Sequence, residues 1–72
     1  MNITTKQEAI AFAKLSADMA FDQQGEYGGL DQSVQVYREN IRDTLNDHGV
    51  WQFEVDAWAA FDSRVKALRP NA

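Results

Sequence analysis

The sequence predicts an all-α fold, a small three-helix bundle with helices over about residues 6–24, 31–48 and 51–68. Two observations lead to this prediction. Glycines interrupt the 72-residue chain at two places, from Gly25 to Gly29 and at Gly49, and divide it into three segments of helical length. Within each segment, apolar residues recur at intervals of three and four, the spacing of a helix with a buried face. We therefore expect residues 1–72 to form a single helical domain.

The first predicted helix begins with a capping box, Thr5-Lys6-Gln7-Glu8. Its apolar arc is wide: Phe12, Leu15 and Met19 form one stripe, and alanines fill the space beside it. An arc this wide needs two neighbours, and alanines allow another helix to approach closely. We expect this helix either to be central in the fold or to be shared with a second copy. The candidate dimer face consists of Ala9, Phe12, Ala13, Ala17 and Ala20.

The second predicted helix has the cleanest pattern. Asp31 is placed to cap its beginning, and Gly49 to end it in a left-handed conformation. The apolar face is made of Val34, Tyr37, Ile41, Leu45 and His48, and the opposite face is polar except for Val36.

Three carboxylates on this polar face, Glu39, Asp43 and Asp47, stand four residues apart and are called the acidic ridge below. Like charges at this spacing weaken a helix slightly, so helix stability does not account for them. Arg38 and Arg42 form a separate basic pair on the flank. This segregation of charge favours a partner of complementary charge, and an ordinary solvated face is the alternative.

The third predicted helix follows a stretch, Val50 to Asp56, whose alternation would also suit a strand with no second strand to pair with. From Val55 the apolar spacing is helical, through Trp58, Phe61, Val65 and Leu68. Acidic residues near its start and basic residues near its end match the helix dipole, and Pro70 ends it. Asp62 and Lys66 are placed to form an ion pair along it.

Trp51 and Phe53 project about 160° apart at the start of this helix, so both cannot face one core. We expect one of them, or Tyr27 in the glycine-rich loop, to be an exposed anchor of the kind that dominates interface energies.

Composition excludes several classes of protein. The chain has no cysteine, which excludes disulfides and thiolate metal sites and suits a reducing cytoplasm. Its net charge of −4 argues against direct binding to nucleic acid or an anionic membrane. No apolar run approaches the roughly 20 residues of a membrane span, and the N-terminal residues do not resemble a secretory signal. A cytoplasmic location, in the producing or host cell, is expected.

Catalytic candidates are few. His48, the only histidine, lies at a helix end where the dipole and free carbonyls give it a structural role. The carboxylates lack the spacing of a calcium loop, and the glycine-rich segment lacks the lysine of a phosphate-binding loop. A helix-turn-helix interpretation would make the third predicted helix the one that enters the DNA major groove. Glu54 and Asp56 at its start would be repelled by the phosphates, which argues against this interpretation. We therefore expect that the protein is not an enzyme and that it binds no metal and no cofactor.

The segment Gly29-Leu30-Asp31-Gln32-Ser33-Val34 resembles the prosthetic-group site of acyl carrier proteins. That family places Asp directly before its modified Ser, whereas Gln32 intervenes here. The resemblance implies phosphopantetheine on Ser33, and the alternative is that Asp31 and Ser33 are ordinary helix-start residues.

The favoured interpretation is a small acidic, non-enzymatic domain that docks on a larger protein with a basic or nucleic-acid-binding surface and inhibits or modulates it. In length and acidity the chain resembles phage-encoded inhibitors such as anti-CRISPR proteins, and also small immunity proteins and antitoxins. The alternative is a homodimeric assembly protein. The candidate partner-binding residues are Tyr27, Val36, Glu39, Asp43, Asp47, Trp51 and Phe53.

Overall fold

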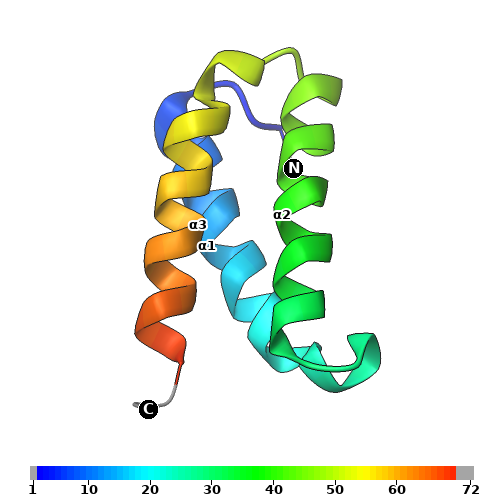
Figure 1. Ribbon diagram of the computed structural model, residues 1–72. Coiled ribbons are helices and arrows are strands. Elements are labelled where there is room, and N and C mark those ends of the chain that lie inside the picture. The colour runs from blue at the N-terminus through cyan, green and yellow to red at the C-terminus, as the bar shows by residue number, and fades with distance from the viewer. Residues whose placement is uncertain (1, 70–72) are drawn as a thin grey trace.

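The computed structural model describes residues 2–69 and confirms the all-α three-helix bundle. Three helices run alternately down, up and down the bundle in Figure 1, and α1 lies behind the other two. Within the described residues, no helix has the length and apolar content that crossing a bilayer requires. In chain order the elements are α1 (Lys6–Asp22), the 3-10 turn η1 (Gln24–Tyr27), α2 (Leu30–Asp47), the 3-10 turn η2 (Trp51–Phe53) and α3 (Glu54–Leu68).

The capping box at the start of α1 is confirmed. The Thr5 hydroxyl accepts a hydrogen bond from the Glu8 N–H at 3.1 Å, and Glu8 Oε1 accepts one from the Thr5 N–H at 3.1 Å. Glu8 Oε1 also accepts hydrogen bonds from the N–H and hydroxyl of Thr4. This carboxylate therefore ties the incoming chain to the first turn of the helix.

The connection between α1 and α2 differs from its prediction. The α1 helix ends at Asp22 rather than residue 24, and Gly28 and Gly29 adopt positive φ angles of 84° and 133°. These glycines turn the chain so that α2 begins at Leu30, with Gly29 as its N-cap and the Ser33 N–H bonded to the Gly29 carbonyl at 3.1 Å. The prediction that Asp31 caps α2 is wrong, because Asp31 lies inside the first turn and pairs with Arg69 at 3.0 Å.

The end of α2 is a Schellman motif, as the placement of Gly49 predicted. Gly49 has a φ of 71°, its N–H donates to the Asn46 carbonyl at 3.1 Å, and the Val50 N–H donates to the Leu45 carbonyl at 2.9 Å. Leu45 and Val50 are both buried, which supplies the apolar contact of this motif. The third α-helix then begins at Glu54, because the predicted first turn, residues 51–53, is 3-10 instead.

The α1 helix is central, since it packs against both α2 and α3 and most extensively against α3. Small side chains at the contact allow this close approach. Phe61 of α3 and Ile41 and Leu45 of α2 are fully buried in the core that results.

The predicted dimer face on α1 is therefore largely wrong. Its four alanines are completely buried within the chain's own core, where no second copy can reach them: Ala9, Ala13, Ala17 and Ala20. Phe12, the remaining member, is half-buried and packs against the edge of that core.

Candidate protein-binding surface

The acidic ridge lies on the exposed side of α2. Glu39, Asp43 and Asp47 are all exposed, and Val36 stands exposed beside them. These residues are helical from end to end, so their side chains follow one side of a rigid element. The ridge is thus available to a partner without any rearrangement of the fold.

The basic residues of the chain are used mainly in ion pairs between helices. Arg38 of α2 reaches Asp62 of α3 through two hydrogen bonds of 3.2 and 3.3 Å. Arg64 of α3 meets Asp18 of α1 at 2.8 Å, and this carboxylate raises the pKa of the guanidinium. Lys6 and Asp56, at 3.8 Å, join α1 and α3 at the other end. These ion pairs between helices therefore place the basic side chains of Arg38, Arg64 and Lys6 on or next to α3.

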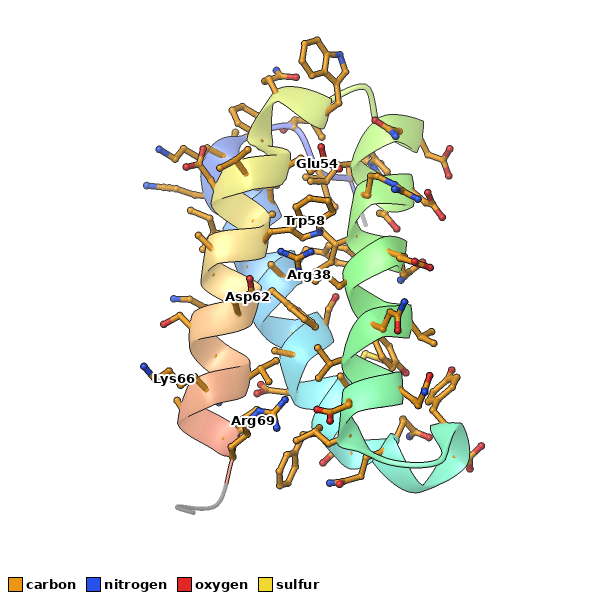
Figure 2. All side chains as sticks on the ribbon, viewed as in Figure 1. Arg38, Glu54, Trp58, Asp62, Lys66 and Arg69 are labelled. Atoms are coloured by element: carbon orange, nitrogen blue, oxygen red, sulfur yellow. The ribbon has the colours of Figure 1, made fainter. Side chains whose placement is uncertain are left out.

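Arg38 is also fixed from a second direction. Its guanidinium lies 4.3 Å from the centre of the Trp58 ring, and Trp58 Nε1 donates a hydrogen bond of 2.9 Å to the Arg38 carbonyl (Figure 2). The prediction that Arg38 and Arg42 form a separate basic pair is wrong, because Arg38 belongs to this contact between α2 and α3. The predicted pair of Asp62 with Lys66 is likewise replaced by that of Asp62 with Arg38.

The ridge consequently has few counter-charges. Among the described residues, Glu39 and Asp47 form no ion pair, and Asp43 has Arg42 at 3.6 Å. The negative potential of this face is therefore only partly neutralised from within the chain.

Glu54 is a carboxylate of a different kind. Its Oε1 is buried and has no hydrogen-bond partner among the described residues, at a point on α3 one turn before Trp58 (Figure 2). It stands in the first turn of α3, where the helix dipole stabilises negative charge.

Trp51 is the exposed anchor among the aromatic candidates, with 66% of its surface accessible. It follows the α2 C-terminus by four residues, so it lies near the end of α2 that carries Asp47. Phe53 is half-buried and packs against the core, which removes it from the candidate surface.

Tyr27 lies at the opposite end of α2 from Trp51 and is also exposed. Its ring meets that of Tyr37 edge to face at 5.9 Å, and burial, with Tyr27 nearby, raises the pKa of Tyr37. Tyr27 is thus partly held by the fold, whereas no aromatic contact holds Trp51 among the described residues.

His48 has the structural role that its position predicted, with a different partner. Its Nδ1 accepts a hydrogen bond of 3.2 Å from the Ile3 N–H, and Ile3 is buried. The histidine therefore fastens the segment before α1 to the end of α2.

Ser33 cannot serve as a prosthetic-group site in this fold. It is completely buried, and its hydroxyl donates a hydrogen bond of 2.6 Å to the Ala20 carbonyl. The implication drawn from acyl carrier proteins is therefore wrong, because a modified serine must be exposed. Within residues 2–69 no group of three or more His, Asp or Glu side chains is arranged to hold a metal ion.

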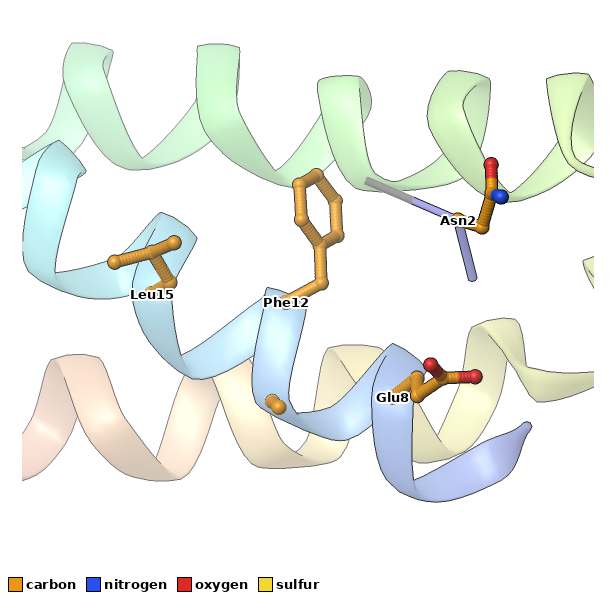
Figure 3. Close-up of a pocket in the computed structure, with 5 residues that line it drawn as sticks. Asn2, Glu8, Phe12 and Leu15 are labelled. Carbon is orange, nitrogen blue, oxygen red and sulfur yellow. The ribbon is translucent and has the colours of Figure 1, made fainter. Parts of the chain in front are cut away.

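A pocket on α1 is the feature that the sequence did not reveal. Its volume is about 270 Å³, and Ala11, Phe12 and Leu15 line it together with Asn2 and Glu8 (Figure 3). Leu15 and Met19, one turn further along, remain 47% and 45% exposed. The spacing of Phe12, Leu15 and Met19 is visible in the sequence, but the sequence does not show that the core takes up the alanines and leaves Leu15 and Met19 exposed.

Comparisons with known proteins give no family for this chain. No protein-family model, no curated protein and no solved structure matches it.

Proposed function

We propose that this chain is a small acidic, non-enzymatic binding protein that docks on a larger protein and inhibits or modulates it. It docks through the acidic ridge of α2 and through Trp51. The target is a basic surface, of the kind that receives nucleic acid, so that the ridge carboxylates replace phosphates. Inhibition of the anti-CRISPR type, within the cytoplasm of a host cell, is the form of this function that the small size and acidity favour.

The observation that supports the proposal is the division of charge between the helices. Arg38, Arg64 and Lys6 form ion pairs that join α3 to α2 or to α1. Glu39 and Asp47, by contrast, are exposed and form no ion pair in the described part of the chain. Like charges four residues apart weaken a helix slightly, and exposed ion pairs contribute only about 0–1 kcal/mol each to stability. The stability of the fold therefore does not explain the acidic ridge, whereas the ridge would steer association with a basic partner.

Trp51 supplies what the charges do not. Complementary charge mainly raises association rates and specificity, and buried aromatic residues provide most of the affinity at interfaces. Trp51, which is 66% exposed and follows the end of α2 by four residues, suits this second role.

The test is charge reversal of Glu39 and Asp47 to lysine, with the double variant Asp22→Lys/Glu26→Lys as a matched control. The control carries the same change in charge on exposed residues outside α2. Each tagged variant is used for affinity capture from native cells, and the co-purified proteins are quantified by mass spectrometry. We expect at least one basic protein to be recovered with the wild type and the control, and to be depleted about tenfold or more with the ridge variant.

The purified partner then allows a kinetic measurement. The ridge variant should associate more slowly, and its rate should depend less on salt than that of the wild type. Equal recovery of every captured protein by the ridge variant and the control would refute the proposed function, provided that circular dichroism shows both variants folded.

A further inference from the structure

A second apolar strip of α1 faces away from the core. Leu15 and Met19 are about half exposed, and Phe12 packs against the core edge beside the pocket of about 270 Å³. In Figure 3, α2 runs along one side of this pocket and α3 lies beyond α1. The lining residues belong to α1 and to the segment before it, so the pocket is a hollow on α1, beside α2 and on the side away from α3, and is called the groove below.

The ridge of α2 borders the same groove. Ser33 faces α1, because its hydroxyl bonds to the Ala20 carbonyl, and Arg38 faces α3, because it pairs with Asp62. At about 100° per residue, Asp47 and Asp43 project roughly 40° and 80° from Ser33, in the direction away from Arg38. These carboxylates thus flank the groove on the α2 side.

A further carboxylate stands at one end of this strip on α1. Glu8 lines the pocket, and its pKa is held below the ordinary value by hydrogen bonds from Thr4 and Thr5, so it is ionised at neutral pH. The groove therefore combines an apolar floor with the α2 carboxylates along one side and Glu8 at one end.

An apolar floor with carboxylates beside it favours some binding partners of the groove over others. A second copy of the chain, itself of net charge −4, would bring the same carboxylates against one another. A helix with apolar residues on one face and lysine or arginine beside them would pair with the floor and with the carboxylates at its side and end. It would also add a fourth helix beside α1 and α2.

We propose that the groove on α1, beside α2, seats a basic amphipathic helix of the protein partner, with apolar side chains on Phe12, Leu15 and Met19. Its lysine or arginine side chains face Glu8, Asp43 and Asp47. This inference rests on the proposed function, since the helix belongs to the protein that the ridge recognises.

The test uses a synthetic peptide of about 18 residues, with leucine at helical a and d positions and lysine elsewhere, titrated into the ¹⁵N-labelled chain. We expect the largest backbone shift changes at Ala11, Leu15 and Met19. The substitution Leu15→Ser should weaken binding about tenfold, since it removes a large apolar contact. Val55→Ser is the matched control, because Val55 is 75% exposed on α3, and it should leave binding unchanged.

Two results would overturn the inference. Equal effects of Leu15→Ser and Val55→Ser would mean that the peptide does not use the groove, and Met19→Ser provides a second variant in case Leu15→Ser fails to fold. A dimer in sedimentation equilibrium that Leu15→Ser dissociates would mean that a second copy fills the groove.

The inference and the proposed function can fail separately. If ridge reversal abolishes partner capture but Leu15→Ser and Met19→Ser do not, the groove is refuted and the proposed function stands. If the peptide occupies the groove but ridge reversal leaves capture unchanged, the proposed function is refuted, and the inference falls with it as a statement about that partner.

Discussion

Ser33 illustrates how one buried hydroxyl joins two helices. It is completely buried, and its bond of 2.6 Å to the Ala20 carbonyl links α2 to α1. We expect Ser33→Ala to lower the free energy of unfolding by about 1 kcal/mol, because the buried hydrogen bond to the Ala20 carbonyl is lost and no new contact replaces it. Urea denaturation measures this change. Ser63→Ala is the control, because Ser63 is exposed on α3, and a loss of equal size there would contradict the assignment.

Glu8 makes the start of α1 sensitive to acid. Its pKa is lowered, first by the Thr4 hydroxyl, then by the Thr4 N–H, and also by the hydroxyl and N–H of Thr5. A lowered pKa in the folded state means that the stabilisation is fully present above the ordinary value of 4.5 and is lost as the pH falls through the folded value.

The expected result is that wild-type stability declines below pH 4.5 more steeply than that of Glu8→Gln. Thermal unfolding by circular dichroism across this range provides the measurement. Glu39→Gln, which removes a ridge carboxylate far from the capping box, should keep the wild-type slope, and identical slopes for all three proteins would contradict the prediction.

At the scale of elements, the turn from α2 to α3 depends on the conformation of one glycine. Gly49 has a φ of 71°, a region that is unfavourable for residues with a side chain. We expect Gly49→Ala to destabilise the protein by about 1 kcal/mol, although no atom lies within 4 Å of the added methyl group.

Gly25→Ala is the matched control for this effect. Its added methyl group also meets nothing within 4 Å, and its φ is not positive. This substitution should be neutral or stabilise by up to about 1 kcal/mol, because it restricts the unfolded chain. Chemical denaturation of both variants decides the question, and an equal loss at both positions would show that conformation is not the cause.

Local signals explain why some helix ends were predictable. The Thr5 and Glu8 capping box and the Gly49 stop are complete within a few residues of sequence. Asp31 was assigned wrongly because its partner, Arg69, lies 38 residues away. Such a pairing depends on how α2 and α3 come together, and no pattern within α2 specifies it.

At the scale of the molecule, close packing of alanines sets the distance between helices. Ala13 is completely buried on α1, which packs against both other helices. We expect Ala13→Leu to destabilise the fold by about 1–3 kcal/mol, because added methylenes in a full core force the helices apart. Thermal unfolding measures it. Ala59→Leu, at an exposed position of α3, should have little effect, and equal losses would contradict this account.

The candidate surface was predictable only in part. The ridge follows from carboxylates at i, i+4 spacing on one helix, so its exposure could be anticipated from Glu39, Asp43 and Asp47 alone. The groove could not, because Phe12 and Leu15 become a pocket wall only once α2 and α3 have covered the alanines. The carboxylates near it also come from two helices, Glu8 from α1 and Asp43 and Asp47 from α2, and their combination exists only in the folded molecule.

The two tryptophans give the protein a pair of separate optical reporters. Trp58 is half-buried, with its indole N–H bonded to the Arg38 carbonyl, and its emission should follow unfolding. Trp51 is 66% exposed and should be quenched readily by iodide or acrylamide. The variant Trp51→Phe should therefore retain the fluorescence change that accompanies unfolding. A blue shift in the emission of Trp51 alone would report that a partner has bound near the end of α2.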